Sequence, residues 1–227
     1  GLSGLSGLSG VGGGAASPLL TSLIAYWKLE NVNDSHTNSL TLTNNNSATF
    51  TSGKVSNAGT FASASSQYLS RASSAAIQFG DEDFTIACWV KAGASGSQVV
   101  ASKDTAGNRE WFLFWNVNQL TFNINAATSA SATSLSTGTW YFAVCEHDAT
   151  ADTISIQVNN GTAVSAATAG VAPQTGTSAL EIGRFSFNAG LNFDGQIDEF
   201  GMWRRKLTAG ERTTLYNGGT GLSYPFS

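Results

Sequence analysis

The chain has little charge, and what charge it has is slightly acidic. Its 227 residues carry 11 Lys and Arg against 15 Asp and Glu, a formal net charge of -4. Proteins that bind nucleic acid neutralise phosphates with clustered basic side chains, so we expect no nucleic-acid partner. No apolar run reaches the roughly 20 residues that a membrane-spanning helix needs, so we expect no membrane span.

Cysteine and histidine are also scarce. The two cysteines, Cys88 and Cys145, lie in apolar segments that we expect to be interior strands. One disulfide and two buried free thiols are both compatible with that placement. The only histidines, His36 and His147, lie in unrelated segments. The sequence therefore has no Cys-His pairing motif for zinc and no motif for a nucleophile.

The first residues differ sharply from the rest. Residues 1–10 are three Gly-Leu-Ser triplets and a closing glycine. Glycine at every third position is what a collagen-like triple helix requires, and the repeat resembles the Gly-X-Ser repeats of some bacteriophage structural proteins. Three triplets without proline are too few to hold a triple helix unaided, so a flexible linker is the alternative.

We divide the chain accordingly. Residues 1–17 form an arm or linker, and residues 18–227 form the folded domain. The assembly contacts that we predict on the arm are Gly1, Leu2, Leu5 and Leu8. Because the sequence starts at Gly1 rather than methionine, we expect a processed product or a part of something longer.

Short apolar segments recur from Leu19 onward, as expected for a β-sandwich. The clearest strand is Phe84–Val90. The other segments that we expect to be strands are 23–29, 59–61, 68–70, 99–102, 111–115, 120–124, 140–145, 153–158, 163–165, 180–183 and 196–203. Helix is confined to 208–216, where Thr208 and Glu211 form a capping box and Gly218 is the expected C-cap.

The order and spacing of several motifs resemble laminin-G-like domains of the concanavalin A-like lectin and glucanase superfamily. The motifs lie at 25–29, 59–61, 84–90, 138–144, 158–161 and 194–199. Ala62 departs from the pattern, because the family usually has an acidic residue there. The resemblance implies an all-β fold, a two-sheet antiparallel jelly-roll sandwich with one short C-terminal helix.

The acidic residues do not follow a catalytic pattern. A glycosidase needs two carboxylates across a cleft, and relatives on this fold carry them in a compact Glu-x-Asp-x-x-Glu arrangement, which this chain lacks. Asp198 and Glu199 are adjacent, so in a regular strand they would point to opposite faces. We therefore predict a protein that is not an enzyme.

The resemblance also implies a structural calcium ion. Its ligands would be the side chain of Asp198 and the main-chain carbonyls of Glu30 and Gly59, since hard oxygen ligands suit calcium. The alternative is that Asp198 accepts backbone N–H groups and fixes the closing strand.

Aromatic and amide side chains between residues 111 and 118 are the candidate glycan site. Trp111 and Trp115 share one face of their strand, while Phe112 and Phe114 take the other. Aromatic rings can stack on sugars, and amides supply directional hydrogen bonds. We predict glycan contacts by Trp111, Trp115, Asn116 and Asn118, with Trp115 and the two asparagines exposed at a hairpin tip.

These observations favour a non-catalytic module on a virion surface, a bacteriophage capsid-decoration or fibre protein with weak glycan binding. Its partners would be other virion or cell-surface proteins, reached through the arm, and glycans; a homo-oligomer such as a trimer is expected. The first alternative is a secreted bacterial carbohydrate-binding or adhesion domain, located extracellularly. The second is a glycoside hydrolase using Glu110 or Glu146.

Overall fold

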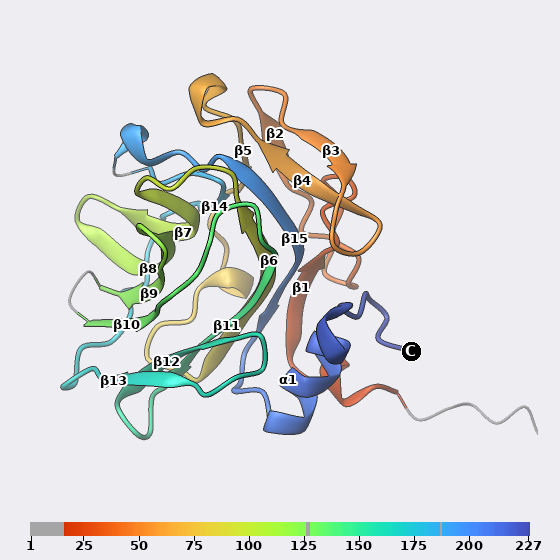
Figure 1. Cartoon of the computed structure of the whole chain (residues 1–227). Helices are drawn as coiled ribbons and strands as arrows, with labels where there is room; N and C mark the ends of the chain where they lie inside the picture. The colour runs from red at the N-terminus through yellow and green to blue at the C-terminus, as the bar shows by residue number, and fades with distance from the viewer. Residues whose placement is uncertain (1–15, 126–127, 187) are drawn as a thin grey trace, which may run out of the picture.

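The computed structural model describes residues 16–125, 128–186 and 188–227. Two antiparallel sheets pack face to face (Figure 1). The eight-stranded sheet has the order β13-β12-β11-β6-β15-β4-β3, with β1 also paired to β15, and the seven-stranded sheet has the order β10-β9-β8-β7-β14-β5-β2. The predicted all-β sandwich with one short C-terminal helix is confirmed.

The element bounds follow the predicted segments closely where the sequence is apolar. The eight-stranded sheet contains β1 Leu23–Trp27, β3 Thr49–Ser52, β4 Asn57–Phe61, β6 Phe84–Ala92, β11 Tyr141–Asp148, β12 Thr153–Val158, β13 Val164–Ala167 and β15 Gly195–Trp203. The seven-stranded sheet contains β2 Thr43–Asn45, β5 Tyr68–Arg71, β7 Gln98–Thr105, β8 Asn108–Trp115, β9 Leu120–Ile124, β10 Thr128–Ala132 and β14 Leu180–Ile182. The helix α1 is Ala209–Tyr216, and the short 3-10 turns are η1 Pro18–Leu20, η2 Ser63–Ser65, η3 Ala75–Ile77, η4 Ala189–Leu191 and η5 Asn217–Gly219.

The main core fills the space between the sheets. Successive side chains of a strand point to opposite faces, so alternate apolar residues of both sheets meet there. Trp27, Trp111, Phe122 and Phe200 are among the side chains buried in this core. Cys88 and Cys145 also lie in it as free thiols, and burial raises the pKa of Cys88 to about 12.

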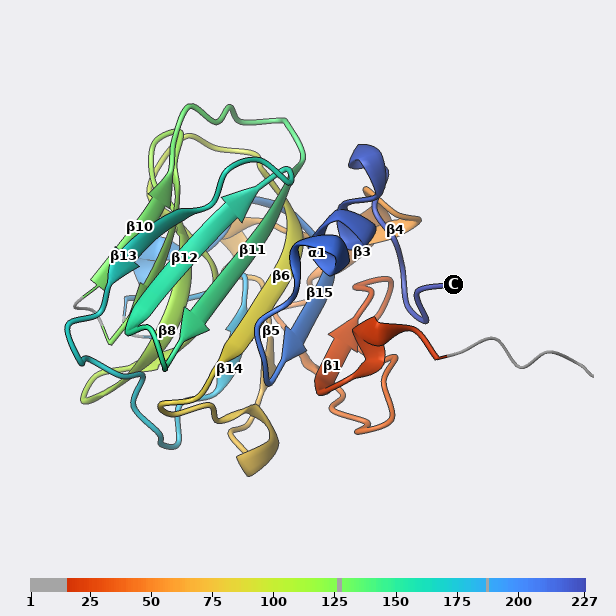
Figure 2. The same ribbon diagram turned by 90° about the horizontal axis from the view of Figure 1, so that it is seen from below.

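A second apolar cluster covers the outer face of the eight-stranded sheet. Leu19 of η1, Leu215 of α1 and Phe226 near the C-terminus pack on Trp89 and Trp203 of the sheet. Figure 2 shows α1 lying over β15 and β6 on this side of the molecule. The part of this face around β1, β6, β11 and β15 is therefore covered by the chain itself.

The helix α1 begins after its predicted cap Thr208 and ends at Tyr216 as predicted, but its C-cap is one residue earlier than expected. The Thr208 hydroxyl accepts a hydrogen bond from the Glu211 N–H at 3.2 Å, and the Glu211 carboxylate accepts one from the Thr208 N–H at 2.8 Å. The C-cap is Asn217, in the left-handed conformation with φ 48°, rather than Gly218. Asn tolerates that conformation, so it can end a helix as glycine does. Within the described residues, no helix has the length and apolar character to span a membrane.

The ion pair that holds the first turn of α1 should weaken in acid. Arg205 contacts Glu211 at 2.6 Å and lowers the pKa of that carboxyl to about 2. A lowered folded-state pKa means stability that is present above the ordinary carboxyl pKa and is lost as pH falls toward 2. With partial solvent screening, we expect Glu211→Gln to cost about 1 to 2 kcal/mol at pH 7.

Urea unfolding of wild type and Glu211→Gln at neutral and acidic pH measures this effect. The difference in the free energy of unfolding between wild type and Glu211→Gln should shrink as the pH approaches the lowered pKa of Glu211. Glu82→Gln, which breaks a more exposed pair with Arg204, serves as the control and should change stability little at either pH. A Glu211→Gln deficit that is independent of pH would rule out the ion pair as its cause.

Candidate functional site

The structure does not bring the four predicted glycan contacts onto one surface. Trp111 and Trp115 are fully buried, with 0% of each side chain exposed, so the predicted exposure of Trp115 is wrong. The reason is alternation: this side of β8 faces the opposite sheet, not solvent. Asn116 and Asn118 lie in the turn after β8, where the Asn116 N–H donates to the Gln119 carbonyl at 2.9 Å. They are turn residues beside a buried tryptophan.

The other side of β8 carries two partly exposed aromatic rings, Phe112 and Phe114. Their ring centroids lie 6.3 Å apart in an edge-on arrangement, and Phe185 packs on Phe112 at 5.1 Å. Phe114 lies opposite Thr121 of β9, and Thr121 lies opposite Ser131 of β10. We call these five residues the phenylalanine face.

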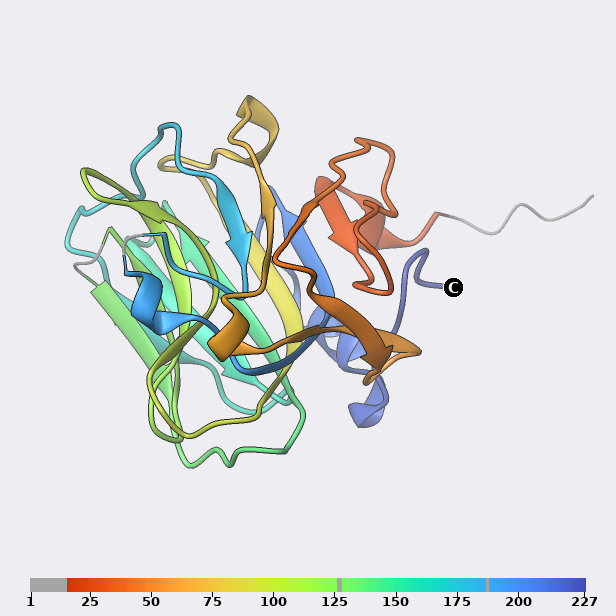
Figure 3. The same ribbon diagram turned by 90° about the horizontal axis from the view of Figure 1, so that it is seen from above.

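The phenylalanine face belongs to the outer side of the seven-stranded sheet. Figure 3 shows the molecule from the side opposite to Figure 2, with α1 now behind the sheets. The Thr121 and Ser131 hydroxyls are 2.9 Å apart, so polar groups adjoin the rings. Sequence reasoning placed Phe112 and Phe114 on the face opposite the tryptophans but gave them no function. The sequence signal for this surface is the alternation itself, which leaves open which of the two pairs is buried.

The loop between β14 and β15 borders this surface. The Gly183 N–H donates to the Val100 carbonyl at 2.8 Å, and the Phe193 N–H donates back to Gly183 at 2.9 Å. Between these two points the loop contributes Phe185 and Arg184. The Arg184 guanidinium lies 4.4 Å from the centre of the Tyr68 ring, and the Ser102 hydroxyl donates to the Arg184 carbonyl at 3.0 Å.

The two carboxylates named for a hydrolase are both held by the fold. Glu110 is 1% exposed and pairs with Lys103 at 2.5 Å, and burial raises the pKa of Glu110 to about 7. Glu146 accepts from Arg212 through both oxygens at 3.1 Å and from the Leu207 N–H at 3.1 Å. Neither carboxylate faces a surface where a sugar could lie.

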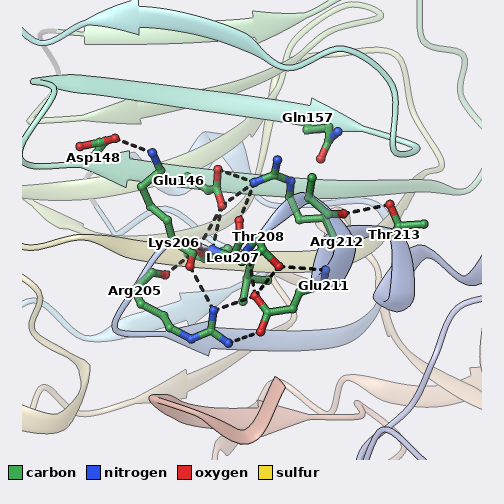
Figure 4. Close-up of polar contacts among 12 residues, drawn as sticks. Glu146, Asp148, Gln157, Arg205, Lys206, Leu207, Thr208, Glu211, Arg212 and Thr213 are labelled. Carbon is green, nitrogen blue, oxygen red and sulfur yellow. Dashed lines mark hydrogen bonds and ion pairs between the residues drawn. The ribbon is translucent and has the colours of Figure 1, made fainter. Parts of the chain in front are cut away.

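Figure 4 shows that Glu146 belongs to a wider polar network around the first turn of α1. The pairs Glu146–Arg212 and Asp148–Lys206 tie β11 to the helix and to the segment before it. The network fixes the helix on its sheet. We therefore assign it a structural role.

Asp198 and Glu199 lie on the same side of β15, contrary to the expectation of opposite faces. The pairing of β15 with β6 slips by one residue between Asp198 and Gly201, and Glu199 has φ 50°. Such a β-bulge puts one extra residue on one strand and turns two successive side chains the same way. Burial raises the pKa of Tyr26, and both carboxylates raise it further, so both lie near this one group. They are 0% and 2% exposed, so no substrate reaches them.

The surroundings of Asp198 match the hydrogen-bonding alternative. Its Oδ2 accepts from the Lys54 and Val55 N–H groups, both at 2.8 Å, and burial raises its pKa to about 7. Oδ1 is buried and has no hydrogen-bond partner among the described residues, so it is the oxygen of this carboxylate left for a metal. Gly59 pairs with Ile197 and Phe50 inside the sheet, where its carbonyl belongs to the ladder.

Of the two alternatives for Asp198 we favour the hydrogen-bonded carboxylate, and calcium binding stays the untested alternative. Among the described residues, no three His, Cys, Asp or Glu side chains gather in a group that could hold a metal. Calcium takes six to eight oxygens, and the predicted ligands supply one carboxylate, that of Asp198, and the main-chain carbonyls of Glu30 and Gly59. The donor set is therefore sparse.

Thermal unfolding with and without a chelator tests whether calcium binds at Asp198. Because Asp198 is already held by two N–H groups, we expect the same Tm in EGTA and in millimolar calcium. If calcium bound here, a calcium concentration one hundred times the Kd would raise the free energy of unfolding by about 2.7 kcal/mol. A calcium-dependent rise in Tm that disappears in Asp198→Asn would contradict our expectation and establish the site.

Comparison with known proteins agrees with this fold. The model of the concanavalin A-like lectin/glucanases superfamily matches residues 63–211, and the chain belongs to that family. No curated protein sequence matches the chain.

Several solved structures have the same fold at low sequence identity. The binding domain of Paraclostridial Mosquitocidal Protein 1 has 14% identity and a TM-score of 0.73, over 87% of this chain and 52% of that one. The binding domain of Botulinum Neurotoxin DC, in complex with SialylT, has 10% identity and a TM-score of 0.63, over 88% of this chain and 52% of that one. This chain therefore spans about half the length of the toxin domains it matches.

A match over nearly the whole of the other chain comes from a different kind of protein. Domain 4 of AbnA, a GH43 extracellular arabinanase from Geobacillus stearothermophilus, in complex with arabinotriose, has 17% identity and a TM-score of 0.64. The match covers 85% of this chain and 97% of that one. At such identities these likenesses show the fold alone.

Proposed function

We propose that this protein is a non-catalytic glycan-binding module and that its sugar contacts lie on the phenylalanine face. The observation that carries the proposal is the pair of partly exposed rings, Phe112 and Phe114, on the outer side of the seven-stranded sheet. A ring of this kind stacks on the apolar face of a sugar, while Thr121 and Ser131 offer hydroxyls beside it.

Two of the similar structures support this proposal. One is a neurotoxin binding domain in complex with SialylT, and the other is an arabinanase domain in complex with arabinotriose. The first is described as a binding domain, and the second as one domain of an arabinanase. Because one fold serves many functions, their support is secondary to the surface itself.

The charges of the sheet support a role in binding without catalysis. The strands of the seven-stranded sheet carry three carboxylates, all buried: Asp104, Glu110 and Glu181. Each pairs with a cation, at 3.4 Å to Arg109, 2.5 Å to Lys103 and 4.0 Å to Arg184 respectively. Glycoside hydrolysis needs two carboxylates facing the sugar, about 5 to 10 Å apart, and carboxylates held in this way do not supply them.

A glycan array probed with the labelled chain tests the proposal. We expect saturable binding to a subset of glycans, and no release of reducing sugar from a panel of polysaccharides incubated with the same protein. An array that stays blank at high protein concentration would overturn glycan binding. Turnover of any polysaccharide would overturn the non-catalytic assignment.

The placement of this module on a virion, its attachment through an arm and its trimeric assembly stay predictions. They rest on the Gly-Leu-Ser repeat, and Gly1, Leu2, Leu5 and Leu8 lie outside the described residues. A secreted protein would use the same binding surface. Electron microscopy of an assembly that contains the whole chain would separate these alternatives.

A further inference from the structure

A small polar cleft lies where the loop between β14 and β15 meets the loop before β7. Its volume is about 180 Å³. The polar side chains that line it are Ser63, Ser97, Gln98, Asn192 and Asp194. Sites for drug-sized ligands occupy roughly 300 Å³ or more, so this cleft suits a single sugar ring rather than a chain of sugars.

Asp194 is held in place from both sides of the cleft. Its Oδ2 accepts from the Ser63 hydroxyl at 3.2 Å and from the Ser63 N–H at 3.4 Å. Its own N–H donates to the Gln98 side chain at 2.6 Å, and its carbonyl accepts from the Gly93 N–H at 2.8 Å. A carboxylate fixed in this way needs little reorganisation to bind a ligand.

Gly93 is required for this arrangement. A Cβ on Gly93 would come within 2.8 Å of the Asp194 Oδ1. The close approach of the two loops therefore depends on the missing side chain. The Asp194 carboxylate therefore lies against the Gly93 backbone, and Asp194 is one of the residues that line the cleft.

The lining selects by charge. Its polar groups are one carboxylate, two hydroxyls and two amides, and the lining residues include no Lys, Arg or His. A carboxylate accepts strong hydrogen bonds from sugar hydroxyls, and it repels an anionic sugar. The net charge of -4 on the whole chain acts in the same direction.

We infer that this cleft receives one ring of a neutral glycan, with sugar hydroxyls donating to Asp194, and that it excludes sugars that carry a carboxylate. The inference rests on the proposed function and gives it a substrate class. One loop joins the two surfaces, because Phe185 packs on Phe112 while Asn192 and Asp194 line the cleft. A glycan that contacts both surfaces must run along this loop.

An array that holds neutral glycans and their sialylated or uronic-acid counterparts tests this inference. Wild type should bind neutral members and leave the acidic ones empty. Asp194→Asn should weaken the neutral binding at least tenfold, whereas Asp152→Asn, in an exposed turn, should match wild type. The Tm of each variant establishes that it folds.

A second variant should change which glycans bind rather than weaken binding. No atom of the described residues lies within 4 Å of the position a Cβ would take on Gly96, at the edge of the cleft, so Gly96→Lys can add a cation there. We expect this variant to gain binding to acidic members of the array.

The outcomes separate the inference from the function on which it rests. Wild type that prefers acidic glycans, or variants with an unchanged profile, would overturn the inference. Binding that survives in Asp194→Asn but is lost in Phe114→Ala would overturn it as well and leave the proposed function standing. A blank array for wild type would remove both.

Discussion

Replacing Trp115 with alanine is expected to lower the free energy of unfolding by about 3 to 5 kcal/mol. Trp115 is 0% exposed and lies in the core between the two sheets, with its ring 6.3 Å from that of Tyr141. Truncation removes a large apolar side chain from water-free surroundings and leaves a cavity that the sheets cannot close. Urea unfolding followed by tryptophan fluorescence or circular dichroism measures the loss.

Val164→Ala is the matched control, because Val164 is 43% exposed on a strand of the other sheet. Its effect should stay within about 0.5 kcal/mol. A loss in Trp115→Ala as small as that of the control would mean that the tryptophan is not in the core. Any loss of glycan binding in Trp115→Ala therefore has to be read together with its stability.

Phe114→Ala should weaken glycan binding at least tenfold while the protein stays folded. Stacking of an aromatic ring contributes about 0.5 to 1.5 kcal/mol beyond the area it buries, and 1.4 kcal/mol corresponds to a factor of ten in Kd. Because Phe114 is only partly buried, its truncation costs less stability than that of a core ring. Isothermal titration with the strongest glycan from the array measures the change.

Phe50→Ala provides the control for this variant. Phe50 is also a partly buried phenylalanine, but it lies on β3, at the edge of the eight-stranded sheet. It should lose a similar amount of stability and bind glycan as wild type does. Equal losses of binding in both variants would show that binding falls with stability and not with the Phe114 ring. Unchanged binding in Phe114→Ala would exclude that ring from the site.

The strands that could be predicted from the sequence are those with an apolar face. Phe84–Ala92 and Gly195–Trp203 lie inside their sheet and bury both faces, so their sequences are distinctive. The missed strands are β2, β3 and β10, which lie at sheet edges. An edge strand can be short and polar, because solvent satisfies one side of it.

The candidate site was predictable only in part. Period-two alternation separates Trp111 and Trp115 from Phe112 and Phe114, but it does not say which pair faces inward. That choice depends on which sheet lies opposite, a tertiary fact. Likewise, alternation fails at Asp198 and Glu199, because the bulge that turns both side chains the same way leaves no clear mark in the sequence.

The cleft at Asp194 could not be predicted at all. Its lining comes from segments far apart in the chain, such as Ser63, Gln98 and Asp194. They meet because the loop between β14 and β15 lies against the loop before β7 in the folded chain. Local sequence patterns do not indicate which distant segments come into contact.

Amide chemical-shift mapping during titration with the strongest array glycan locates the glycan site on the fold. We expect the largest shifts on residues 112–114, 121 and 184–185, with α1 and β12 unchanged. Shifts concentrated on α1, or spread evenly at saturation, would contradict a glycan site on the outer side of the seven-stranded sheet.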